Sequence, residues 1–115
     1  MVSHVVLMAP RPDLTASERT AFVALFDRAL REIPSVRGVR IGKRIVHGAA
    51  YESLAREVFE FVAVIDFEDL AGLQAYLQHP THSELGARFY QTLSSAAVYD
   101  FQTWGREGLD QLTTR

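Results

Sequence analysis

The residues best suited to acid–base chemistry lie in one short segment. His79 and His82 are two of the four histidines in the chain; Pro80 lies between them, and Tyr76 precedes them. Histidine titrates near neutral pH, so a positioned histidine can take up and return a proton during a reaction. A neighbouring tyrosine hydroxyl can orient that base or polarise a carbonyl group. The segment therefore makes His82 and Tyr76 the best candidates for a catalytic pair.

The proline decides whether the two side chains can meet. We expect Tyr76 near the end of one helix and His82 near the start of the next, so that the turn at Pro80 brings both to one cleft. A structural interpretation remains open, in which His82 packs into the helix junction with its ring hydrogen-bonded to the backbone.

The remaining histidines suggest binding or structural roles. His79 precedes proline, which favours an extended backbone, and we expect its ring to bond a neighbouring carbonyl and fix the turn. His4 lies on the same face of a predicted strand as Val6 and Met8, where it would pack in the core or line a cavity. His47 is expected in a solvated turn.

The same segment offers one possible set of metal ligands, formed by His79, His82 and Glu84. Two histidines and a carboxylate can bind a transition metal, but this spacing matches no established motif. The chain contains no cysteine, which excludes thiolate ligands, disulfides and cysteine nucleophiles. We therefore expect no metal and no cofactor.

Hydrophobic periodicity and turn residues divide the chain into strands and helices. Thr15 and Glu18 have the spacing of a capping box, and Pro34 would end the helix that they begin. Alternating and β-branched apolar residues predict the strands. We expect strands at 2–8, 36–47, 58–67 and 95–104, and helices at 15–33, 68–79 and 82–93.

This order of elements predicts an α+β fold with a ferredoxin-like arrangement. Helices would cover one face of a four-stranded antiparallel sheet. The strand at 58–67 is apolar on both faces, so we expect it to be central and covered on both sides. Because no helix remains for the second face, a two-fold homodimer that packs sheet on sheet would cover it.

The chain is expected to form one domain at residues 1–104 and a C-terminal tail at 105–115. The tail has two glycines and little pattern, so we expect it to be loosely held unless a partner orders it. The connection from Gly48 to Glu57 carries Tyr51 and Leu54. These two side chains would either form a lid over a cavity or pack against the dimer mate.

The amino-acid composition limits the kinds of partner that the protein is expected to bind. The chain has 115 residues, 48% of them hydrophobic and 23% charged, with a formal net charge of −2, as in ordinary globular domains. This charge provides no general attraction to nucleic acids or anionic membranes. No segment approaches the ~20 apolar residues of a membrane span, and the N-terminal segment lacks the basic start of a signal peptide. We expect a cytoplasmic protein that binds neither nucleic acid nor membrane.

Six short motifs in order resemble the stress-responsive A/B barrel (Dabb) domain family. They span residues 4 to about 104, and the Tyr-x-x-His-Pro-x-His signature at 76–82 is one of them. The others are His4-Val5-Val6-Leu7, Ile33-Pro34-Ser35-Val36, Val39-Arg40-Ile41-Gly42, Asp66-Phe67-Glu68-Asp69 and Val98-Tyr99-Asp100-Phe101. The resemblance implies a dimeric α+β barrel.

The resemblance also implies roles for individual residues. Some members of the family are similar to a plant polyketide cyclase, which performs an intramolecular aldol condensation without metal or cofactor. There, the residue matching His82 is the general base, the tyrosine matching Tyr76 assists it, and the histidine matching His4 lines the cavity. A second tyrosine of that enzyme aligns with Phe26, so this chain lacks one hydroxyl. The candidate ligand-binding residues are thus His4, Phe26 and His79.

Three functions remain open at this point. The first is a homodimeric Dabb-type protein that binds a small apolar or aromatic molecule between sheet and helices. The second is a cofactor-free, polyketide cyclase-like enzyme that uses His82 as its base. The third is a structural dimer or oligomer building block.

Overall fold

The structure, a computed structural model, describes residues 1–114. All the strands and helices predicted from the sequence are present. In chain order the elements are β1 (Val2–Pro10), α1 (Ala16–Glu32), β2 (Val36–Lys43), the 3-10 helix η1 (Ala50–Leu54), β3 (Phe61–Phe67), α2 (Leu70–Gln78), α3 (Pro80–Thr92), β4 (Leu93–Gln102) and the 3-10 helix η2 (Arg106–Thr113).

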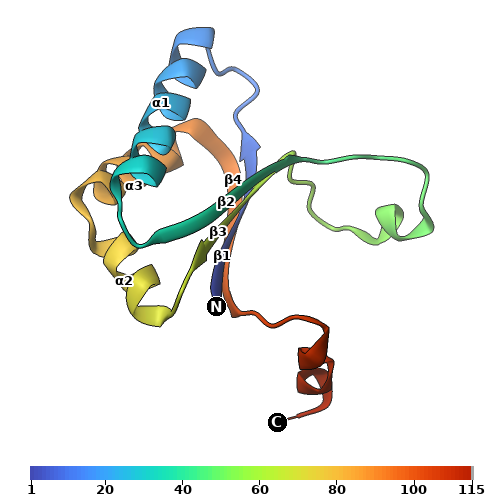
Figure 1. Cartoon of the computed structure of the whole chain (residues 1–115). Coiled ribbons are helices and arrows are strands. Elements are labelled where there is room, and N and C mark those ends of the chain that lie inside the picture. The colour runs from blue at the N-terminus through green and yellow to red at the C-terminus, as the bar shows by residue number, and fades with distance from the viewer. Residues whose placement is uncertain (115) are drawn as a thin grey trace.

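The strands form one antiparallel sheet in the order β2-β3-β1-β4. β1 is an inner strand that pairs with β3 on one side and with β4 on the other. The helices α1, α2 and α3 lie together on one side of this sheet (Figure 1). The predicted α+β class and ferredoxin-like topology are therefore confirmed.

The capping box predicted at the start of α1 is present. The Glu18 N–H donates to the Thr15 hydroxyl oxygen at 3.1 Å, and the Thr15 N–H donates to Glu18 Oε1 at 3.2 Å. At the other end, Ile33 is the C-cap with an extended backbone, and Pro34 follows it. Both helix ends thus obey local rules that involve only sequence neighbours.

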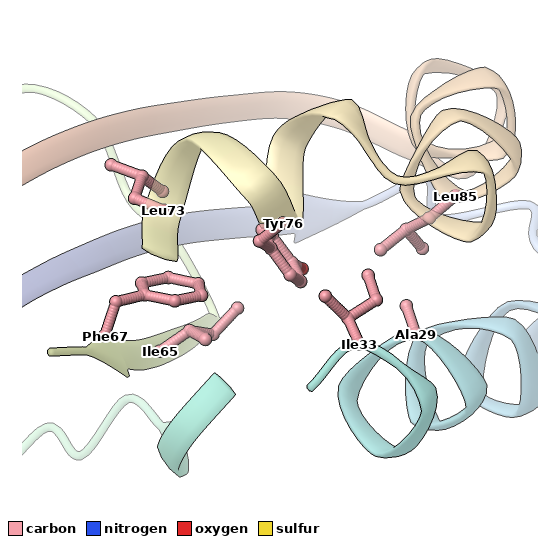
Figure 2. Packing of buried hydrophobic residues seen from close by; sticks show 7 residues of the cluster. All are labelled: Ala29, Ile33, Ile65, Phe67, Leu73, Tyr76 and Leu85. Atoms are coloured by element: carbon pink, nitrogen blue, oxygen red, sulfur yellow. The ribbon is translucent and has the colours of Figure 1, made fainter. Parts of the chain in front are cut away.

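The core lies between the helices and the inner face of the sheet. Its main cluster of buried residues comprises Ala29, Ile33, Ile65, Phe67, Leu73, Tyr76 and Leu85 (Figure 2). A smaller cluster lies further along the strands and comprises Val6, Met8, Ala63 and Leu93. Phe26 of α1 packs against both clusters, so it lies at the boundary between them.

Several predicted element boundaries differ from the structure, and three of them are at ends of β2, β3 and β4. β2 ends at Lys43 rather than at 47, and β3 begins at Phe61 rather than at 58. Strand pairing stops there because residues 44–60 leave the sheet and form a separate segment around η1 (Figure 1). β4 begins at Leu93, two residues earlier than predicted, so Leu93 is a buried strand residue rather than the end of a helix.

The prediction that β3 is covered on both sides is not met within this chain. β3 is an inner strand, but the helices cover only one of its faces. Buried Ala63 and Ile65 on that face alternate with half-buried Val62 and Val64 on the other. The strand register places six large apolar residues on this second side, which we name the outer face: Val5, Leu7, Val62, Val64, Tyr99 and Phe101.

The C-terminal segment has more regular structure than the sequence predicts. η2 follows β4 after a short connection, and all its residues are exposed except Gly108, which is half-buried. The division into a domain at 1–104 and a tail at 105–115 stays a prediction, and Arg115 lies outside the described residues. None of the helices in residues 1–114 has the length and apolar character needed to cross a membrane.

Candidate functional site

His79 holds the turn between α2 and α3. It is the C-cap of α2, where its N–H donates to the Tyr76 carbonyl oxygen at 3.2 Å, and also the N-cap of α3. The Thr81 N–H donates to His79 Nδ1 at 3.1 Å. The ring therefore accepts a bond from a backbone N–H, whereas the sequence predicted a bond to a carbonyl. The physical reason is that the first N–H groups of a helix lack partners, and an N-cap side chain supplies one.

This turn brings Tyr76 and His82 into contact, with ring centroids 4.7 Å apart. Tyr76 is only 1% exposed, and its ring centroid lies 5.2 Å from that of Phe67. Figure 2 shows it at the centre of the main core cluster. Burial raises the pKa of Tyr76 to about 12, because the phenolate would lose its solvation. At neutral pH the hydroxyl stays protonated, so it can donate a hydrogen bond but cannot act as a base.

His82 is half-buried at the start of α3. Burial lowers the pKa of His82 from its ordinary value of 6.5, and the charge that His4 can carry lowers it further. A hydrogen bond with the backbone of Leu77 acts in the opposite direction. The neutral ring, which is the form that accepts a proton, therefore predominates at neutral pH. The bond with Leu77 also ties His82 to the helix junction, as the structural interpretation requires.

Asp100 binds the His4 ring, a role that the sequence did not predict. The two residues lie directly opposite each other on β1 and β4, and His4 Nδ1 is 2.6 Å from Asp100 Oδ1. The His4 side chain is 7% exposed and the Asp100 side chain 45%, so solvent reaches this pair on the β4 side. The motif containing Asp100 was visible in the sequence, but only the strand register reveals its partner.

These contacts assemble a histidine cluster, which we define as His82, Tyr76, His4 and Asp100. The Tyr76 ring contacts both imidazoles, and its centroid is 5.9 Å from that of His4. A carboxylate bonded to Nδ1 orients an imidazole and determines which of its nitrogens carries the proton. The structure thus joins three predicted site residues from α3, α2 and β1. The cluster combines a proton acceptor with a protonated hydroxyl, which are the two groups that carbon-acid chemistry requires.

Phe26 lies in a different place, in the wall of a cavity of about 460 Å³ between α1 and the sheet. Neither the residues of the histidine cluster nor His79 line this cavity. Phe26 nevertheless connects this cavity with the core, because it also packs against the core cluster that contains Tyr76. The residues that line the cavity are Met8, Pro10, Leu14, Arg19, Phe22, Val23, Phe26, Asp27, Leu30, Ile41, Phe61, Thr92 and Leu93.

The possible metal ligands His79, His82 and Glu84 do not converge. His79 Nδ1 already accepts the Thr81 N–H, and Glu84 forms an ion pair with Arg28 of α1. In the part of the chain from residue 1 to 114, no three histidine or acidic side chains are arranged to hold a metal ion together. The segment that suggested a metal site is instead used for helix capping and for packing α3 on α1.

The fold and the histidine cluster define a small ferredoxin-like α+β domain with a histidine–tyrosine site beneath its helices. The chain belongs to the stress responsive A/B barrel domain (Dabb) family, because the sequence model of that family matches residues 2–103. The resemblance inferred from the six motifs is therefore confirmed.

Individual proteins are similar in sequence or in fold. Olivetolic acid cyclase from Cannabis sativa is 19% identical over 100 residues, which cover 87% of this chain and 94% of the cyclase. Hydroxynitrile lyase from Passiflora edulis has a TM-score of 0.75 at 13% identity, over 90% of this chain and 94% of the lyase. A dimeric ferredoxin-like protein of unknown function from Thermobifida fusca has a TM-score of 0.67 at 20% identity, over 89% and 90%. At these identities the solved structures establish the shared fold.

The charge that His4 can carry gives a prediction about the protonation of His82. In a His4→Gln variant the pKa of His82 should rise, because a neighbouring charge is removed, yet stay below 6.5, because burial remains the largest cause of the shift. NMR titration of the His82 ring protons measures this change. His47→Gln, at an exposed histidine outside the cluster, is the control and should leave the His82 titration unchanged. A pKa of His82 that stays constant or falls in His4→Gln would contradict the proposed coupling.

Proposed function

We propose that this protein binds a small apolar or aromatic molecule in the cavity between α1 and the sheet. The observation that carries the proposal is the cavity itself. Its volume of about 460 Å³ lies within the range of roughly 300–1,000 Å³ that is typical of small-molecule sites. Most of its wall is apolar, while Arg19 and Asp27 are exposed residues of α1 that offer polar contacts.

The chemistry of the wall supports an apolar ligand with an aromatic part. Phe22 and Phe26 both line the cavity, with ring centroids 5.8 Å apart and planes inclined by 85°. Aromatic rings prefer such edge-to-face contacts, so a ligand ring can add to the pair. Burial of apolar surface contributes roughly 25 cal/mol per Å², and an apolar ligand leaves few polar groups without partners on entry.

Blocking the cavity tests the binding proposal. Ile41 lines the cavity from the edge strand β2 and is 63% exposed, so Ile41→Trp should fill the opening with little effect on the core. The affinity for the aromatic probe 1-anilinonaphthalene-8-sulfonate, measured by fluorescence titration, should fall by at least about tenfold, or ~1.4 kcal/mol.

The matched control is Val39→Trp, on the same face of β2 but outside the cavity lining, and it should keep the affinity. In the unchanged protein, probe at a hundred times its Kd should stabilise the fold by about 2.7 kcal/mol in thermal denaturation. Equal affinities in the two tryptophan variants would refute the cavity as the binding site.

A second candidate is a cofactor-free, cyclase-like enzyme that works at the histidine cluster. The observation that favours it is the contact between protonated Tyr76 and His82, whose lowered pKa keeps the base neutral. Sequence similarity to olivetolic acid cyclase adds support. Because Tyr76 is buried, a substrate in the cavity reaches it only when side chains of the wall move. Phe26, which lines the cavity and packs against the core cluster that contains Tyr76, is the candidate for this movement.

The proposed reaction is the carbon–carbon bond-forming addition step of an intramolecular aldol condensation. His82 would remove a proton from a carbon atom next to a carbonyl group, and Tyr76 would donate a hydrogen bond to the oxygen that gains negative charge. The carbanion would then form a carbon–carbon bond with a second carbonyl carbon of the same molecule. The resulting alkoxide would take the proton back from His82, which restores the base. His4, oriented by Asp100, would line the site.

Replacing the base tests this second candidate. His82→Gln should reduce turnover of a linear poly-β-keto substrate by about 10²–10⁴-fold, because an amide cannot accept a proton at neutral pH. Turnover is followed by the absorbance of the cyclised product. His47→Gln should keep full activity. Unchanged turnover in His82→Gln would rule out His82 as the base, and absence of turnover in the unchanged protein would leave ligand binding as the function.

The protein is also proposed to act as a homodimer that packs through its outer face. The large side chains of that face are mostly apolar, although Arg40 and Asp66 also lie on it, and Tyr99 and Phe101 are 56% and 51% exposed. Exposed apolar patches of this kind mark interaction surfaces. The ferredoxin-like protein from Thermobifida fusca is described as dimeric, which supports the proposal. Nucleic-acid or membrane partners are not expected at a net charge of −2, and a cytoplasmic location stays a prediction from the sequence.

Light scattering tests the dimer. The unchanged protein at micromolar concentration should have about twice the chain mass of 12.9 kDa. Val64→Glu, on the outer face of β3, should shift the mass towards one chain, because two glutamates would meet in the apolar interface. Leu70→Glu places the same change on an exposed position of α2 and should leave the mass unchanged. A single-chain mass for the unchanged protein would disprove the proposed homodimer.

A further inference from the structure

Residues 44–60 form a segment, which we name the arm, that carries apolar side chains into solvent. The arm connects β2 to β3 and includes η1, and Figure 1 shows it extending away from the sheet and the helices. Leu54 is 79% exposed and Tyr51 67%. The exposed large apolar residues of the arm are Ile45, Val46, Tyr51, Leu54 and Val58. In this conformation the arm is not a lid over the cavity, which was one of the two roles left open by the sequence.

The arm has a definite shape that depends on its own hydrogen bonds. The Glu52 carboxylate accepts the N–H groups of His47 at 3.0 Å and of Gly48 at 2.9 Å. His47 Nε2 lies 3.2 Å from the Tyr51 hydroxyl. Gly48 has a φ of 88°, a conformation that glycine adopts without strain. These contacts hold the apolar side chains of the arm in solvent, although their exposure contributes nothing to the stability of the fold.

The arm and the C-terminal segment extend on the same side of the molecule. In Figure 1 the helices lie on one side of the sheet, while the arm and η2 project on the other. Trp104, Leu109 and Leu112 of the C-terminal segment are also exposed. The radius of gyration is 15.8 Å, against about 13 Å for a compact domain of this length. The excess agrees with two segments that stand away from the domain.

We infer that the arm clasps a second copy of this chain seated on the outer face, with Tyr51 and Leu54 packed against the partner. The inference rests on the proposed homodimer. A subunit on the outer face lies on the side to which both segments project, so one association event would bury their apolar side chains. Two-fold symmetry makes each contact occur twice, since the arm of either subunit reaches the other.

The charge of the arm favours a protein partner of this kind. Arg44 and Arg56 are balanced by acidic residues that include Glu57 and Glu60. A segment of mixed sign does not attract nucleic acid or an anionic membrane, whereas it allows two identical arms to approach without strong repulsion. The dimeric description of the Thermobifida fusca protein agrees with a second copy as the occupant.

Truncation of the arm's apolar side chains tests the clasp. In Tyr51→Ser/Leu54→Ser, the dimer dissociation constant from sedimentation equilibrium should rise about tenfold or more, as expected when buried interface anchors are lost. The matched control is Leu70→Ser/Tyr90→Ser, which removes the same two residue types from exposed positions on α2 and α3. The control should keep the dissociation constant of the unchanged protein.

A crosslinking experiment tests the contact directly. Because the chain has no cysteine, Leu54→Cys introduces a single thiol that can carry a benzophenone label. Irradiation of dimers mixed from isotopically light and heavy chains should yield covalent dimers with crosslinks between the two chains. The same label at Tyr90→Cys should yield none. An unchanged dissociation constant in the arm variant would overturn the clasp but not the homodimer. The same holds if the label at Leu54→Cys reacts only within its own chain. A monomeric unchanged protein overturns both.

Discussion

The register of β1 is the constraint on which the site depends. This strand pairs with β3 and β4 at the same time, so a shift by one residue would turn its inner side chains to the outer face. The observed register sets His4 opposite Asp100 and, on the same face, Val6 opposite Ala63. It therefore determines where the His4–Asp100 pair of the histidine cluster lies and how the smaller core cluster packs.

Burial gives the histidine cluster its chemical character. The same desolvation that raises the pKa of Tyr76 lowers that of His82, so both groups remain uncharged near neutral pH. A neutral imidazole beside a protonated phenol is suited to proton transfer, and it is also a stable way to pack two aromatic rings in a core. The cluster thus satisfies structural and catalytic requirements with the same contacts. Because the same ring contacts also serve core packing, they are weaker support for an enzyme than the open cavity is for ligand binding.

The cavity and the histidine cluster share no residue. Phe26 lies in the cavity wall and against the core around Tyr76, and the plant cyclase to which the family resemblance points has a tyrosine at this position. A phenyl ring makes the boundary wholly apolar, since it neither donates nor accepts a hydrogen bond. A ligand bound in the cavity, as proposed, would be held mainly by shape and apolar contact.

The sequence by itself determined what depends on neighbours along the chain. The capping box at Thr15, the helix end before Pro34 and the turn at His79 follow from local hydrogen bonding and backbone sterics. The tertiary structure alone decided what depends on residues far apart in sequence: the 2.6 Å contact of His4 with Asp100, the separation of the cavity from the cluster and the direction of the arm. Strand register and helix packing set these features, and both arise from the total burial of many side chains, which no local pattern encodes.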